Sequence, residues 1–336
     1  MTVERTDKIT RLMEQYDLPW ADADEDLCDD AAKKLRTFKK DLPEDRDDAA
    51  GAVKRLNDRE RGEATEALRD HWDGFAKDFD VVASAAGEIA DGLVASLDAV
   101  ADTKRAIIDV VINFQERIAD LTGDAPHWIG RTAEQEQAVV ADASATRPRL
   151  EAEIGTARTR CDERLTRVRN DNDVAALKRI AGLPEGTGNG EGDRAIGGLA
   201  PGVGSGSGGD SGGSRAFGGD NMAASPQGTT AYNGFWTEHD EHKRAISSLD
   251  KAATHLRDET STALAKAAVD IAEFGASGTL GASVAAGYAQ LLDDLVLATR
   301  ALGNHLTGPL SDAIRAASED QKRVDEENAR RFWWNR

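Results

Sequence analysis

The chain has 336 residues and carries 42 Lys and Arg against 61 Asp and Glu, a formal net charge of -19. The acidic residues are spread over both halves, and a surface of that sign repels phosphate backbones, so we expect no nucleic-acid partner. Hydrophobic residues make up 40% of the chain but aromatic residues only 5%. The apolar content is therefore mainly Ala, Leu, Val and Ile, which favours thin helical bundles over one large core.

The first expected elements lie before residue 72. A short helix is expected around Asp26 to Lys40, and "DLPEDRDDAAGAVKRL" reads as the start of another, with Pro43 in its first turn and acidic residues near its N-terminus. We expect this second helix to run from about Asp47 to His71. Together these segments predict two helices separated near Pro43.

A longer helix is expected from Phe75 to Leu121, because its apolar residues recur mostly at spacings of three and four. Gly123 and Pro126 should end it. A further, highly charged helix is expected from about Thr132 to Ile180, broken or kinked near Pro148. Residues 1–182 are thus predicted to form one helical bundle.

Residues 183–233 differ sharply in composition from the rest of the chain. They hold about half of its 32 glycines together with Ser, Asn and Pro. Such a segment lacks the apolar side chains needed to offset the entropy of ordering its backbone. We therefore predict a disordered linker.

Residues 234–336 are predicted to form a second helical hairpin. One apolar stripe extends from Leu249 to Phe274 and another from Val284 to Leu306, with the glycine-rich "FGASGTLG" between them. Gly308 and Pro309 should interrupt the second arm, which then resumes as a charged helix. The predicted fold is all-α, with two antiparallel helical units joined by the linker.

The stretch "HWDGF" contains a Trp-x-Gly turn, Trp72 to Gly74, between the two amphipathic helices of the first unit. We expect the glycine to let the chain reverse, and Trp72 with Phe75 either to cover the end of the bundle or to offer an apolar surface to a partner. Helix, Trp-x-Gly turn and longer alanine-rich helix, over roughly Asp47 to Leu121, resemble the WXG superfamily of type VII (ESX-type) secretion substrates. They resemble in particular the WXG-like N-terminal regions of larger actinobacterial proteins.

The C-terminal hairpin is similar in layout to another family of ESX-associated helical hairpins, in which a Phe-Gly turn replaces the Trp-x-Gly turn. Here that turn would be Phe274 and Gly275. The resemblance implies a helical protein partner, such as a WXG-type protein or a secreted toxin, or self-association. It also implies a secretion substrate, a co-secreted partner or an adaptor.

Directly exported members carry a tyrosine followed four residues later by an acidic residue. Here Trp20, Trp236 and Leu292 follow Tyr16, Tyr232 and Tyr288 at that distance. We therefore expect a protein that acts in the cytoplasm or leaves the cell with a partner that carries the motif. The alternative is a cytoplasmic coiled-coil scaffold unrelated to secretion.

No membrane span is expected, because the best apolar runs, "AIIDVVINF" and "LLDDLVLA", are short and contain aspartates. The first residues also lack the apolar stretch of a secretory signal peptide. Cys28 and Cys161 lack metal-ligand spacing. They are expected to be reduced core residues, or to form one long-range disulfide after export.

No catalytic residues, cofactor or metal site are expected. His239 and His242 share one helix face, but the solvated first turn of an acidic helix explains them without a metal. No nucleophile elbow and no Cys/His/Asp pattern on a strand-turn-helix background is present. The aromatic tail, Phe332, Trp333 and Trp334, should either fold back onto the C-terminal hairpin or dock onto a partner.

The linker interpretation predicts the pattern of limited proteolysis. The first cuts should fall between Gly186 and Gly228, leaving two resistant helical fragments, because glycine-rich segments without a core fit most readily into a protease. Mass spectrometry of the early fragments measures this. First cleavage within Phe75 to Leu121 would contradict it.

Overall fold

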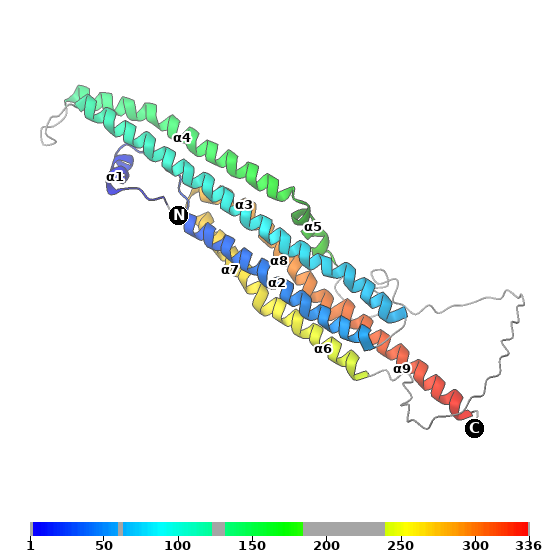
Figure 1. Ribbon diagram of the computed structural model, residues 1–336. Helices are drawn as coiled ribbons and strands as arrows, with labels where there is room; N and C mark the ends of the chain where they lie inside the picture. The colour runs from blue at the N-terminus through cyan, green and yellow to red at the C-terminus, as the bar shows by residue number, and fades with distance from the viewer. Residues whose placement is uncertain (1–2, 60–62, 123–131, 184–238, 335–336) are drawn as a thin grey trace, which may run out of the picture.

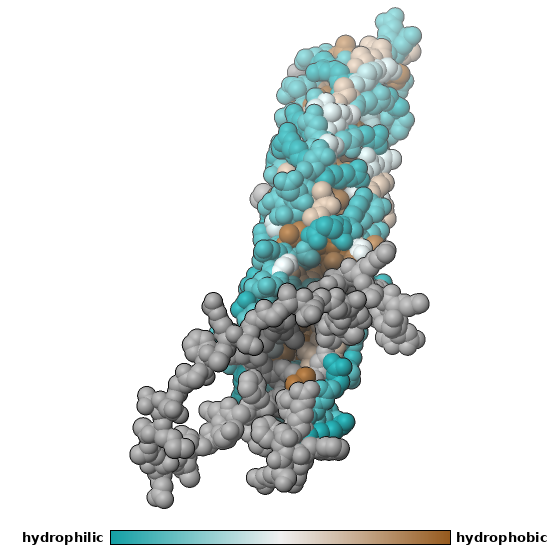
Figure 2. Space-filling view, turned by 90° about the vertical axis from the view of Figure 1, so that its right-hand side faces the viewer, coloured by the Kyte–Doolittle hydropathy of each residue, from teal (hydrophilic) through white to brown (hydrophobic). Residues whose placement is uncertain are grey.

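In the computed structural model, the described residues are 3–59, 63–122, 132–183 and 239–334. They contain helices and no strand, which confirms the predicted all-α class. The expected linker lies almost wholly outside them. The helices run side by side in a long, narrow bundle (Figure 1). In Figure 2 the visible face of the described residues is mainly hydrophilic, with apolar side chains in small patches.

The N-terminal region contains α1 (Asp7–Gln15), α2 (Glu25–Arg59) and α3 (Glu63–Thr122). α2 includes the helix expected from Asp26 to Lys40 and the first part of the one expected from Asp47 to His71, so the expected separation near Pro43 is wrong. The last part of the second expected helix belongs to α3. Pro43 removes one intrahelical hydrogen bond. Its neighbours Phe38, Leu42 and Asp45 are fully or almost fully buried against other helices, and this packing holds the helix together across the proline.

α3 has 60 residues and is therefore about 90 Å long. It runs without interruption through Trp72, Asp73 and Gly74, so the expected turn at these residues is wrong. α2 ends at Arg59 and α3 begins at Glu63, well before the expected turn. A glycine inside a helix costs only about 1 kcal/mol relative to alanine, which the packing of the neighbouring Trp72 and Phe75 outweighs.

α4 (Ala133–Arg169) follows the N-cap residue Thr132, whose side chain and that of Gln135 form a capping box. It continues through Pro148, where a break or kink was expected. The expected single segment to Ile180 divides instead near Asn170, and α5 (Asn172–Ala181) starts at the N-cap residue Asp171. Local capping, rather than proline, sets these boundaries.

The C-terminal hairpin has two compound arms. The first consists of α6 (His239–His255), the π-helical segment η1 (Leu256–Thr260) and α7 (Ser261–Ala276). The second consists of α8 (Thr279–His305), the π-helical segment η2 (Leu306–Leu310) and α9 (Ser311–Trp334). Gly308 and Pro309 thus lie in a π-helical turn and do not end the arm.

The two regions expected to fold as separate units share one hydrophobic core. α2, α3, α8 and α7 form a four-helix bundle in which each helix packs against the next, and α4 and α5 add a further layer against α3 and α8 (Figure 1). Contacts of Glu25 with Lys104 and of His71 with His305 show that neighbouring helices run antiparallel. The thiols of Cys28 and Cys161 are free and buried in this core.

The turn between α7 and α8 is fixed by the segment that precedes α2. The amide of Asp24 donates a hydrogen bond to Ser277 Oγ (3.0 Å), and the amide of Gly281 donates to the carbonyl of Asp22 (3.3 Å). Gly278 has a φ of 159°, and a Cβ added to it would lie 2.6 Å from that carbonyl oxygen. A side chain at this position would therefore push the N-terminal segment away from the hairpin turn.

Gly278→Ala is predicted to lower the free energy of unfolding by about 2 kcal/mol or more, because the new methyl group meets backbone rather than a movable side chain. Urea denaturation followed by circular dichroism measures the change. Gly155→Ala, at an exposed helical glycine with open space around it, is the control and should be neutral or stabilising by up to about 1 kcal/mol. Equal stability of the two variants would contradict the contact with Asp22.

Candidate functional site

Trp72 and Phe75 lie on the buried side of α3, with 6% and 5% of their surfaces exposed. Their ring centroids are 5.9 Å apart in an edge-to-face arrangement, and Phe75 packs in the same way on Phe79 at 5.4 Å. Gly74 is on the opposite side, where an added Cβ would meet nothing within 4 Å. The structure thus brings together the two aromatic residues of the predicted site and separates Gly74 from them.

An open groove between α2 and α3 reaches the edge of Trp72. It has a volume of about 600 Å³. Gly51 and Asn57 line it from α2, and Trp72 and Asp73 line it from α3. The side-chain oxygen of Asn57 is buried and has no hydrogen-bond partner within the described part of the chain. The groove therefore offers the apolar edge of Trp72 to an incoming side chain, whereas the oxygen of Asn57 is buried and not accessible from it.

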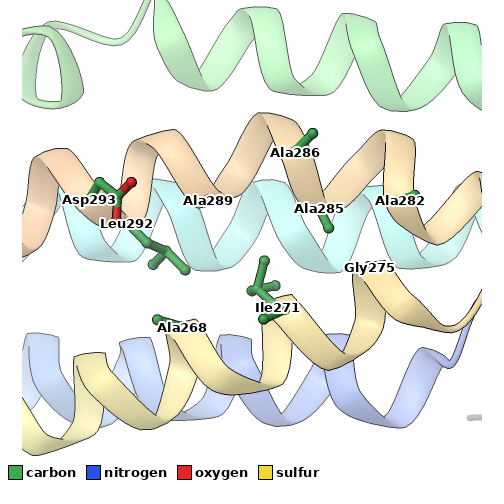
Figure 3. A pocket seen from close by; sticks show the side chains of 10 residues that line it. Ala268, Ile271, Gly275, Ala282, Ala285, Ala286, Ala289, Leu292 and Asp293 are labelled. Carbon is green, nitrogen blue, oxygen red and sulfur yellow. The ribbon is translucent and has the colours of Figure 1, made fainter.

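A second hollow lies between the arms of the C-terminal hairpin (Figure 3). Small side chains of α7 and α8 line it, together with Ile271, Leu292 and Asp293, over a volume of about 350 Å³. Phe274 is buried and Gly275 belongs to the last turn of α7, so the expected turn at these residues is wrong by three positions. Gly275 instead lets α7 approach α8, because an added Cβ would lie 2.9 Å from that of Ala285.

The remaining predicted positions are only partly described. The backbone of Phe332, Trp333 and Trp334 forms the end of α9, but their side chains lie outside the described residues. The same holds for the side chain of His239. His242 is not at a solvated surface as expected, since only 2% of it is exposed.

Two histidine pairs that the sequence interpretation missed connect the N-terminal and C-terminal regions. The first joins His71 of α3 to His305 of α8, with 2.9 Å between their Nε2 atoms. His305 is 4% exposed and packs on Phe75, with ring centroids 4.2 Å apart. One ring must donate and the other must accept, so this hydrogen bond needs at least one neutral imidazole.

The surroundings of His305 determine which ring donates. Its Nδ1 has no hydrogen-bond partner among the described residues. A proton there would be left buried without an acceptor, which costs more than an unused lone pair, so we place the proton on Nε2, where it is donated to His71. Burial and the nearby His71 lower the pKa of His305 to about 4, and burial lowers the pKa of His71. Both rings are therefore neutral at physiological pH.

The second pair joins Asp45 of α2 to His255 at the end of α6. The Nδ1 atom of His255 lies 2.6 Å from Oδ1 of Asp45, and the hydroxyl of Thr260 donates to Oδ2, also at 2.6 Å. Asp45 is 1% exposed, whereas 40% of the His255 side chain is accessible. The hydrogen bond with Asp45 raises the pKa of His255, while burial raises that of Asp45 despite its two bonds.

A short sequence repeat marks both pairs. His255 and His305 are each followed by Leu, four further residues and Ser. In each case the Leu and the four residues after it form the π-helical segment, η1 or η2. Ser261 and Ser311 each donate to the carbonyl five residues before them, at 2.6 and 2.8 Å. This repeat was visible in the sequence, but the partners of the two histidines, far away in the N-terminal region, were not.

Comparisons with protein-family models, with curated proteins and with solved structures found no match to this chain. Within its described residues, no helix is both long enough and apolar enough to cross a bilayer. The resemblance to type VII secretion proteins therefore depends on the sequence alone, and the Trp-x-Gly stretch that carries it lies inside α3 rather than in a turn.

The His71–His305 pair predicts a loss of stability in acid. The pKa of His305 is about 4 in the folded chain and about 6.5 in the unfolded chain, so as the pH falls the unfolded chain binds a proton first. The contribution of neutral His305 to the free energy of unfolding is therefore complete above pH 6.5 and decreases as the pH drops toward 4. For His305 the loss is about 2 kcal/mol at pH 5. Urea denaturation near pH 8 and near pH 5 measures this loss of unfolding free energy. The loss should be present in the native sequence and smaller in His305→Gln.

His255→Gln provides the control, because the pKa of His255 is shifted in the opposite direction. The stabilising effect of the native His255 side chain is present below pH 6.5 and declines at higher pH. His255→Gln should therefore retain the acid-dependent loss that His305→Gln reduces. If both variants lose the same free energy between pH 8 and pH 5, His305 is not the group responsible.

Proposed function

We propose that this chain is a non-enzymatic, helical partner-binding protein associated with type VII secretion, acting as a substrate, a co-secreted partner or an adaptor. The observation that carries the proposal is the α2–α3 groove beside Trp72. It lies within the region that resembles the WXG superfamily. A groove bordered by an aromatic edge is the kind of surface on which a protein partner gains affinity.

The partner expected from the resemblance is a WXG-type helical protein. Its contact with the groove would involve an apolar side chain packed against the edge of Trp72. Trp72 itself is a poor test residue, because truncating so buried an aromatic side chain should cost about 3 kcal/mol of stability. Binding would then be lost through unfolding as well as through the missing contact.

Gly51 offers a cleaner test. It lines the groove on α2, and a Cβ added there meets only the end of the Arg55 side chain, at 3.5 Å. Gly51→Gln should fill the groove and leave α2 intact, since glutamine is the better helix former. Gly155→Gln on α4 is the matched control, because it makes the same exchange at an exposed glycine away from the groove.

Purified WXG-type proteins of the same genome should be tested by calorimetry for binding to the full chain. We expect at least one to bind, Gly51→Gln to weaken it about tenfold or more, and Gly155→Gln to leave it unchanged. Loss of the type VII ATPase should also change the amount of the protein found outside the cell. Equal binding by both variants, or the absence of any WXG-type partner, would contradict the proposal.

A cytoplasmic coiled-coil scaffold is the second candidate. The length of α3, about 90 Å, favours it, because a helix of that length can hold partners well apart. A scaffold would remain inside the cell whether or not the type VII ATPase is present. The localisation experiment therefore separates the two candidates.

A further inference from the structure

His255 and Glu259 place a nitrogen and an oxygen next to each other on the surface of the first C-terminal arm. They are four residues apart, and 3.2 Å separates Nε2 of His255 from Oε2 of Glu259. The two side chains are accessible, with 40% and 74% of their surfaces exposed. They border an open hollow of about 360 Å³.

The buried side of His255 is fixed by Asp45. A carboxylate only accepts hydrogen bonds, so Nδ1 of His255 carries the proton, and in the neutral ring the lone pair of Nε2 then faces Glu259. Asp45 is itself held by the hydroxyl of Thr260. This arrangement of carboxylate, histidine and outward-facing nitrogen is the one by which proteins orient a metal-binding imidazole.

We propose that His255 and Glu259 bind a divalent transition-metal ion of the Zn²⁺ type, with Asp45 and Thr260 as positioning residues. Two ligand atoms 3.2 Å apart, each about 2.1 Å from an ion, enclose an angle of about 100°, close to the tetrahedral angle of zinc sites. An imidazole ligand favours Zn²⁺, Cu²⁺ or Ni²⁺ over Mg²⁺ and Ca²⁺.

The site is open and its ion exchangeable. Among the described residues, no three His, Cys, Asp or Glu side chains form a ligand group, so water completes the coordination. The acidic residues Asp250 and Asp258 also border the hollow, against a single lysine, Lys251, and their negative potential favours a cation. Both ligand side chains are exposed and lie outside the buried core, so removal of the ion should leave the fold intact.

A proton competes with the ion for Nε2. When His255 is protonated it bridges Asp45 and Glu259, and Glu44 of α2 also favours that charged form. Metal binding displaces this proton and is therefore stronger at pH 8 than at pH 6. Because Asp45 lies on α2 and both ligands lie on the C-terminal arm, a bound ion strengthens the connection between the two regions of the chain.

The test is calorimetric titration of the full, metal-stripped chain with Zn²⁺ at about pH 8, where a proton competes less with the ion for Nε2 of His255. We expect one saturable site and a rise in thermal midpoint with Zn²⁺ concentration. Glu259→Gln and His255→Gln should each weaken binding by about tenfold or more, and Thr260→Val, which releases Asp45, by about tenfold. Mg²⁺ in excess should not compete.

His71→Gln is the matched control, because it removes a histidine from the other interhelical pair and should leave Zn²⁺ affinity unchanged. Glu259→Gln alters an exposed side chain, so its helicity and thermal midpoint without metal should equal those of the native sequence. Undetectable Zn²⁺ binding by the native chain would overturn the proposal. Affinity that is unchanged in both Glu259→Gln and His255→Gln would overturn it as well.

Discussion

Neither helical hairpin of this chain can cover its own apolar side chains, and the architecture depends on that constraint. α2 buries Leu35 and Phe38, α3 buries Ile89 and Leu93, and α7 and α8 complete the shared core against which they pack. Two antiparallel helices meet along only one line, so each needs a second neighbour to exclude water from its remaining apolar surface. The groove and both histidine pairs arise where these neighbours meet.

Much of the helical layout could be predicted from residue spacing, because periodicity reports directly which side of a helix is buried. The long stripe that begins at Phe75 lies in α3 and is buried as far as Ile118, whereas its last member, Leu121, is exposed. The interruptions were less predictable. Pro43, Pro148 and Gly74 all favour breaks locally, yet each lies inside a helix, since burial of neighbouring side chains over several turns outweighs a local cost of about 1–3 kcal/mol.

The residues that join the two regions could not be paired from the sequence. His71 and His305 are 234 residues apart, and Asp45 and His255 are 210 residues apart. Each of these side chains, taken alone, resembles an ordinary polar residue on a charged helix. The predicted aromatic residues Trp72 and Phe75 were brought together, but as parts of a packed cluster that includes His305 rather than of a turn.

The two π-helical segments have a geometric consequence for the C-terminal hairpin. A turn closed by a bond to the fifth residue holds one residue more than an α-helical turn, which advances the following side chains by about 100° around the helix axis. η1 and η2 begin 50 residues apart in sequence, and Leu256 of η1 lies beside Gly303, just before η2. The side chains of both arms therefore change direction around their helix axes at about the same position along the bundle. Because both arms contain the same extra residue, their apolar stripes stay aligned with each other. An extra residue in one arm alone would rotate the apolar stripe of that arm out of the shared core.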